Sequence, residues 1–126
     1  MKIDKELLKG STTMLILSLL KKEEMYGYKI TAELKAYSDG TFDLKEGTLY
    51  PLLHSLENSN YIKAYWVDAE SGRKRKYYQI TKTGIKLLED KKKEWSIYSS
   101  AVNKVIGGTC YEWEANKLFR WGMQPH

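Results

Sequence analysis

A change in the spacing of the apolar residues near residue 60 constrains the fold of this chain more than any other feature. Before that point, four leucines recur at the three- and four-residue spacing of one helix face: Leu49, Leu52, Leu53 and Leu56. After Asn58-Ser59-Asn60 the spacing becomes two, with Ile62, Ala64 and Trp66 on one side. The chain is therefore predicted to pass directly from an amphipathic helix into a β-strand.

A second alternating segment follows the first across a turn at residues 68–72. Within residues 73–80, Lys76, Tyr78 and Ile80 share one side, which predicts a two-stranded hairpin. The returning strand opens with four basic residues, Arg73-Lys74-Arg75-Lys76. We expect this charge at the tip of the hairpin, converging on the same side as the helix.

Two helices are predicted before this region. Residues 4–22 read as one helix capped by Asp4, and its two apolar stripes need cover on two sides. The stripes are Leu8, Leu15, Ile16 and Leu19 on one side, and Leu7, Gly10, Met14 and Leu17 on the other. We expect one stripe to be covered by a partner subunit or by the last helix.

The second predicted helix, Tyr26 to Ser38, stops at Asp39-Gly40. Its inward residues are expected to be Tyr26, Ile30, Leu34 and Tyr37. A short link, Thr41 to Leu44, then leads to the leucine-bearing helix. Two helices joined by a tight connection form a helix-turn-helix arrangement.

Pro51 leaves two starts open for the leucine-bearing helix, because a proline is tolerated only in the first turn. If Thr48 is the N-cap, Pro51 falls in that turn, where its missing N–H would have had no partner. If the helix begins near Lys45, we expect a bend at Pro51.

A long last helix is predicted from about residue 82 to 106, capped by Thr81 or Thr83 and ended by Gly107-Gly108. Its apolar residues follow the spacing of a helix that packs along another helix: Leu88, Trp95, Tyr98, Val102 and Val105. For residues 109–126 we predict a tail without assigning it order.

Composition narrows the class of protein. The 126 residues suffice for one domain, and the net charge of +5 is local, since residues 73–93 hold nine Lys or Arg against two acidic residues, a charge of +7. The single cysteine, Cys110, excludes an internal disulfide, and neither a signal peptide nor a membrane-spanning run is present. We expect a soluble, cytoplasmic protein that binds no membrane.

Nothing in the sequence favours catalysis. No nucleophile, base and orienting group occur together, there is no glycine-rich phosphate loop, and no carboxylate or cysteine pattern accompanies His54. We therefore expect no enzyme, no cofactor and no metal site.

Three blocks in the chain resemble the PadR family of bacterial transcriptional regulators. The blocks are MYGYKI (Met25 to Ile30), GTLYPLLHSLENSNYI (Gly47 to Ile62) and GRKRKYYQITKTG (Gly72 to Gly84). The resemblance covers roughly residues 4–106 and implies a mainly α fold with a small β-hairpin. It divides the chain into a winged helix-turn-helix DNA-binding domain (1–80), a C-terminal dimerisation helix (81–108) and the tail (109–126).

The resemblance also implies site residues. Contacts to DNA would come from the leucine-bearing helix, the second helix and the hairpin: Lys45, Thr48, Tyr50, Pro51, His54, Tyr26, Lys29, Arg73, Lys74 and Arg75. The chain departs from the family at Lys45, where Ser or Asn is common, and at Ser55, where a basic residue is common. The first departure weakens a helix cap at Lys45 but favours a phosphate contact there, and the second weakens guanine reading at Ser55.

One branch of the short subfamily binds flat aromatic compounds on a tryptophan of the last helix, and Trp95 is similar in position. The space beside it would be lined by Leu7, Gly10, Met14, Ser18, Trp95, Ser99 and Val102. The expected protein is thus a ligand-responsive repressor that binds a palindromic operator in double-stranded DNA as a homodimer. For Trp95, the alternative to ligand binding is ordinary packing between helices. For the protein as a whole, the alternative function is a winged helix that mediates protein contacts, with Tyr50 and Trp66 as interface anchors.

Overall fold

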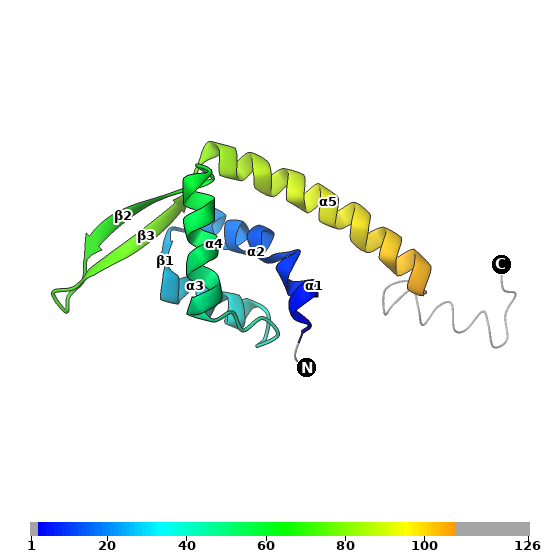
Figure 1. The fold of residues 1–126 in the computed structure, drawn as a ribbon, viewed down its shortest axis with the longest axis horizontal. Coiled ribbons are helices and arrows are strands. Elements are labelled where there is room, and N and C mark those ends of the chain that lie inside the picture. The colour runs from blue at the N-terminus through cyan, green and yellow to red at the C-terminus, as the bar shows by residue number, and fades with distance from the viewer. Residues whose placement is uncertain (1–2, 108–126) are drawn as a thin grey trace, which may run out of the picture. The chain divides into compact units, whose positions relative to one another are not determined.

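The protein is described here by a computed structural model that covers residues 3–107. Its elements in chain order are α1 (Lys5–Lys9), α2 (Thr12–Lys22), β1 (Met25–Tyr26), α3 (Gly27–Tyr37), α4 (Glu46–Asn58), β2 (Ile62–Asp68), β3 (Lys74–Ile80) and α5 (Lys82–Ile106) (Figure 1). The chain divides into two compact units, with the boundary inside α5 between Glu89 and Asp90. The predicted tail, 109–126, lies outside the described residues.

The core of the first unit is formed by α2, α3 and α4 against the base of the β2–β3 hairpin. The leucine stripe of α4 lies in it as predicted, with Leu49, Leu53 and Leu56 buried and Leu52 partly buried. The first turns of α5 join the same core through Leu88. The hairpin extends away from these helices (Figure 1).

The prediction of one helix over residues 4–22 is wrong, because the chain breaks at Gly10-Ser11. The carbonyl oxygen of Leu8 accepts hydrogen bonds from the Ser11 N–H (3.0 Å), the Ser11 hydroxyl (3.2 Å) and the Thr12 hydroxyl (2.7 Å). Such side-chain bonds compete with the helical ladder, and a glycine beside them weakens it further. The predicted cap is confirmed, since Asp4 accepts from the Glu6 N–H at 2.8 Å.

The two apolar stripes of this segment do not stay separate. Leu17, assigned to the second stripe, is fully buried together with Ile16 of the first. Leu7 is exposed, whereas Met14 is partly buried against the core. Only part of the second stripe is therefore open to a partner.

The second predicted helix is α3, which begins one residue later than predicted, at Gly27, and whose last residue, Tyr37, is exposed. Ile30 and Leu34 are buried as expected, but Tyr26 belongs to β1 and the Tyr37 side chain is 62% exposed. The predicted stop is confirmed, since Asp39 and Gly40 have φ angles of +51° and +81°.

The predicted two-stranded hairpin is confirmed as β2–β3. Within residues 3–107, β1 adds a third strand, so that the order in the sheet is β1-β3-β2. The hairpin pairs Ile62 with Ile80 and Ala64 with Tyr78 as the alternation predicts. β1 adds only two residues, and no periodicity can be read from so short a strand.

The leucine-bearing helix, α4, begins at Glu46, so Thr48 is not its N-cap. Pro51 lies in its second turn and offers no N–H to the carbonyl of Gly47. The bend expected for this start stays a prediction.

The last helix matches its predicted span. Of the two candidate caps, Thr81 is the N-cap, because its hydroxyl accepts a hydrogen bond from the Gly84 N–H at 3.0 Å. Gly107 ends the helix with a φ of +114°. Within residues 3–107, no helix has the length and apolar character needed to cross a membrane.

Candidate nucleic-acid interface

One face of α4 is exposed and polar but carries no positive charge. The exposed residues of this face are Thr48, Tyr50, Pro51, His54 and Ser55. The only charged residues of the helix are Glu46 and Glu57. Hydroxyl and imidazole groups can bond base edges or phosphates, whereas long-range attraction to phosphate requires cations elsewhere.

The side chain of Tyr50 is placed by α3 as well as by its own helix. A Cβ atom added at Gly27 would lie 2.5 Å from the Tyr50 hydroxyl oxygen and 2.8 Å from Cζ. The Tyr50 ring therefore occupies space that only glycine leaves open. Its side chain remains 44% exposed, so one part packs and another faces solvent.

The basic residues after the hairpin turn do not share one side. Gly72, with φ of +81°, completes the turn, and Arg73 and Lys74 are exposed beside it. Arg75 and Lys76 are neighbours in β3 and so point to opposite faces of the sheet. The expectation that all four charges converge on the helix side is therefore wrong.

Lys76 faces α4 and is already paired. Its Nζ lies 3.3 Å from a carboxylate oxygen of Glu57 and 5.6 Å from the centroid of the Tyr78 ring. Burial raises the pKa of Tyr78, whose ring lies in the core. Lys76 thus joins the hairpin to α4 instead of projecting a charge into solvent.

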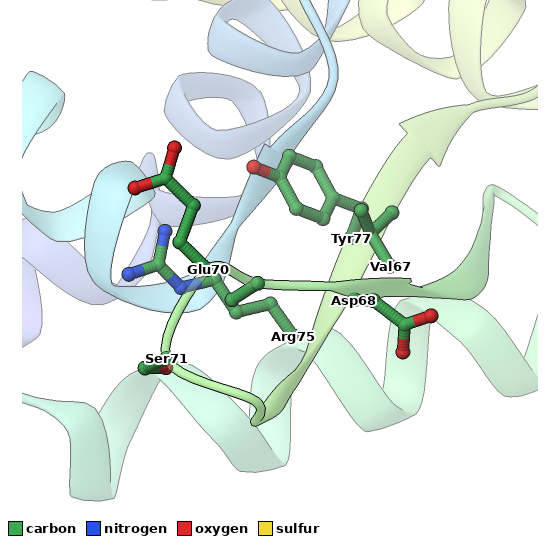
Figure 2. Close-up of a pocket in the computed structure, with 7 residues that line it drawn as sticks. Val67, Asp68, Glu70, Ser71, Arg75 and Tyr77 are labelled. Atoms are coloured by element: carbon green, nitrogen blue, oxygen red, sulfur yellow. The ribbon is translucent and has the colours of Figure 1, made fainter.

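Arg75 lies on the other face, at the side of a shallow hollow of about 520 Å³ near the hairpin tip. Figure 2 shows Arg75 and Tyr77 extending from β3 on the same side, with Val67 of β2 beside Tyr77. The Arg75 guanidinium lies 4.5 Å from the centroid of the Tyr26 ring. Two predicted phosphate contacts, Tyr26 and Arg75, therefore touch each other.

The remaining predicted cations each have an acidic neighbour. Lys29 Nζ lies 2.6 Å from Glu23, and this hydrogen bond raises the pKa of Lys29. Lys45 Nζ lies 3.2 Å from Asp43, and the ammonium group lowers the pKa of that carboxyl. Both pairs are exposed enough for a phosphate to compete for the lysine.

The predicted effector residues fall into two groups, one in each unit. Leu7 lies on α1, Gly10 in the break, and Met14 and Ser18 one turn apart on α2. On α5, Trp95, Ser99 and Val102 share a face by spacing; Trp95 is 46% exposed, and its ring centroid is 6.2 Å from that of Tyr98.

Sequence reasoning missed Glu24 and Tyr65 as partners in this region. The Tyr65 hydroxyl donates a hydrogen bond to the Glu24 carboxylate, which raises the pKa of Tyr65. Tyr65 stands between Ala64 and Trp66 in the sequence, so the alternation places it on the other side of the first hairpin strand. Its partner could not be predicted, because only the pairing of β1 brings residues 24–26 to the hairpin.

Helix-turn-helix and hairpin together define a winged helix, with α3 and α4 as the helix pair and β2–β3 as the wing. Residues 16–90 match the transcriptional regulator PadR-like family. The chain belongs to this family, whose members are transcriptional regulators and not enzymes.

Solved structures and a relative agree with this membership. A transcriptional regulator from Clostridium thermocellum is 36% identical, with a TM-score of 0.74 over 79% of this chain and 97% of that one. A PadR-like transcriptional regulator from Bacillus cereus is 35% identical, with a TM-score of 0.72 over 83% and 100%. An uncharacterized protein of Lysinibacillus sphaericus is 34% identical over 82% of this chain and 94% of its own length.

Proposed function

We propose that the protein is a DNA-binding transcriptional regulator that acts as a ligand-responsive repressor. The observation that carries the proposal is an exposed, polar face of α4 next to a basic wing, in a chain of the PadR-like family. Major-groove reading needs a helix with short polar groups, and affinity needs cations close by. The chain provides both in adjacent elements.

The two elements divide the work. Thr48, Tyr50, Pro51 and His54 choose the sequence through hydrogen bonds and contact with thymine methyl groups. Arg73, Lys74 and Arg75 supply phosphate contacts, joined by Lys29 in the first turn of α3 and Lys45 just before α4. Lys76 is not among them, because it lies on the opposite face of the wing from Arg75 and points toward α4.

The operator is proposed to be palindromic and the regulator a homodimer joined through α5. The part of α5 that belongs to the second unit exposes large apolar side chains along much of its length, among them Trp95, Ile97, Tyr98, Val105 and Ile106. A monomer gains nothing from exposing such a surface, whereas a second helix would cover it. Two recognition helices would then enter successive major grooves about 34–36 Å apart.

The effector is proposed to be a planar aromatic compound that stacks on Trp95. Its site would be completed by Ser99 and Val102 and by Leu7, Gly10, Met14 and Ser18. The exposed ring of Trp95 offers a flat, electron-rich surface. Such a ligand weakens DNA binding only if it binds more tightly to a dimer whose two winged-helix domains stand at a spacing that does not fit the operator.

The test is fluorescence anisotropy with labelled DNA from upstream of the chain's own gene, beside a scrambled duplex, across a salt series. We expect tighter binding to the native duplex and a steep loss of affinity with salt. Equal binding to both duplexes would contradict sequence-specific regulation. No binding to either would favour the protein-contact alternative, in which the 63% exposed Trp66 is an anchor.

A further inference from the structure

Three tyrosines form one row across the sheet. The strand register pairs Tyr26 of β1 with Tyr77 of β3, and Tyr77 with Tyr65 of β2. The ring centroids are 5.5 Å apart in the first pair and 5.9 Å apart in the second. Directly opposed aromatic side chains stabilise strand pairing, so the row helps to hold the two-residue β1 on the wing.

Both ends of the row have a polar partner. At the β2 end, the Tyr65 hydroxyl donates its hydrogen bond to Glu24, the residue before β1. At the β1 end, the Arg75 guanidinium lies over the Tyr26 ring, 4.5 Å from its centroid. The row therefore spans the sheet and finishes at the Arg75 guanidinium.

Stacking on a ring restrains an arginine without using up its donors. An exposed arginine samples many rotamers, and ordering it on binding costs free energy. A guanidinium with one face on an aromatic ring keeps its N–H groups directed outward in its own plane, where a phosphate can accept them. The Arg75 side chain is exposed at this position.

Gly27, the residue after Tyr26, lies against α4. It leaves the space that the Tyr50 ring of α4 fills. Residues 26–27 thus contact one proposed DNA-binding side chain on the wing and another on α4.

We propose that Tyr26 is a positioning residue, whose ring holds Arg75 of the wing in place for a DNA phosphate, and that its hydroxyl does not itself bind DNA. This inference rests on the proposed function and gives Tyr26 a different role from the phosphate contact that the family resemblance implies. Tyr26 acts through Arg75, so removing the Tyr26 ring matters only while Arg75 is present.

The experiment is a double-mutant cycle with Tyr26→Leu and Arg75→Gln, and Tyr26→Phe as the variant that keeps the ring. Binding to a mixed-sequence duplex is followed by anisotropy between about 50 and 200 mM salt. We expect Tyr26→Leu to weaken binding about two- to fivefold and Tyr26→Phe to match the wild type. Arg75→Gln should weaken binding and reduce the salt slope by about 0.9, and adding Tyr26→Leu to it should change little.

Four results would overturn the inference. If the wild type binds DNA but Tyr26→Leu costs the same affinity in the wild type and in Arg75→Gln, the positioning role is refuted. The same holds if Tyr26→Phe loses as much affinity as Tyr26→Leu. Either result leaves the proposed function standing. No DNA binding by the wild type removes the proposed function and this inference with it. Independently of folding of the variants, proton NMR of the free wild type should show the Arg75 δ-protons shifted upfield of those of Arg73 by the ring; equal shifts would refute the stacking.

Discussion

Gly84→Ala should destabilise the first unit strongly, although alanine is the better helix former. A Cβ at Gly84 would overlap the carbonyl oxygen of Tyr61 and lie 2.8 Å from Cγ1 of Ile80. That carbonyl already accepts hydrogen bonds from the Thr81 N–H at 3.1 Å and the Thr81 hydroxyl at 3.0 Å. Because this oxygen belongs to the backbone, the overlap can be relieved only if the start of α5 moves away from Tyr61, which weakens the hydrogen bonds of Thr81 to that oxygen.

The expected cost combines three effects. Overpacking costs about 1–3 kcal/mol, a weakened cap costs about 0.5–2 kcal/mol, and alanine returns about 1 kcal/mol of helix propensity. The net loss is about 2 kcal/mol, which lowers the melting temperature of a unit of this size by roughly 8–16 °C.

A matched substitution in α4 controls for the chemistry. Gly47→Ala places the same methyl group where no atom lies within 4 Å. It should leave stability unchanged or raise it by up to about 1 kcal/mol. Thermal and urea unfolding followed by circular dichroism measure both variants. A Gly84→Ala protein as stable as the wild type, or equal shifts for the two variants, would refute the reasoning from the Tyr61 contact.

Three further outcomes are expected. Gly27→Ala should displace the Tyr50 ring, so native upstream DNA loses affinity while a scrambled duplex binds as before; equal losses would contradict this placement of Tyr50. Combined Arg73→Ala and Lys74→Ala should weaken all duplexes alike and reduce the salt slope by about 1.8, and an unchanged slope in a salt titration would remove the wing from the phosphate contacts. Trp95→Ala should abolish changes in tryptophan emission on titration with planar aromatic compounds, since the ring is proposed to stack them; unchanged titration curves would place the ligand elsewhere.

Long periodic elements could be predicted from the sequence. The leucines of α4 and the alternation through Ile80 carry many repeats of one period, and each repeat reinforces the same assignment. The helix over 82–106 followed from its spacing and its threonine cap. The break at Gly10-Ser11 was missed because it depends on where two hydroxyl groups form hydrogen bonds, and composition does not reveal that.

The exposure of the candidate site residues on α4 was predictable, but the contacts among the site residues were not. The exposure of Tyr50 and Pro51 follows from the stripe of leucines on the opposite face. That Arg75 and Lys76 diverge follows from strand alternation, and the sequence interpretation overlooked it. The contact between Tyr26 and Arg75 depends on β1, a pairing between residues about fifty positions apart in the chain that no local pattern encodes.

Hydroxyl-radical footprinting of the DNA upstream of the chain's own gene tests most directly whether α4 and the wing read an operator as a pair of winged helices. We expect two protected tracts of related, inverted sequence on one side of the duplex, with centres about one helical turn, or 34–36 Å, apart. Protection should disappear with Tyr50→Ala at protein concentrations that saturate the wild-type complex. A single protected tract would contradict the two-fold arrangement, and uniform protection without tracts would contradict sequence reading by α4.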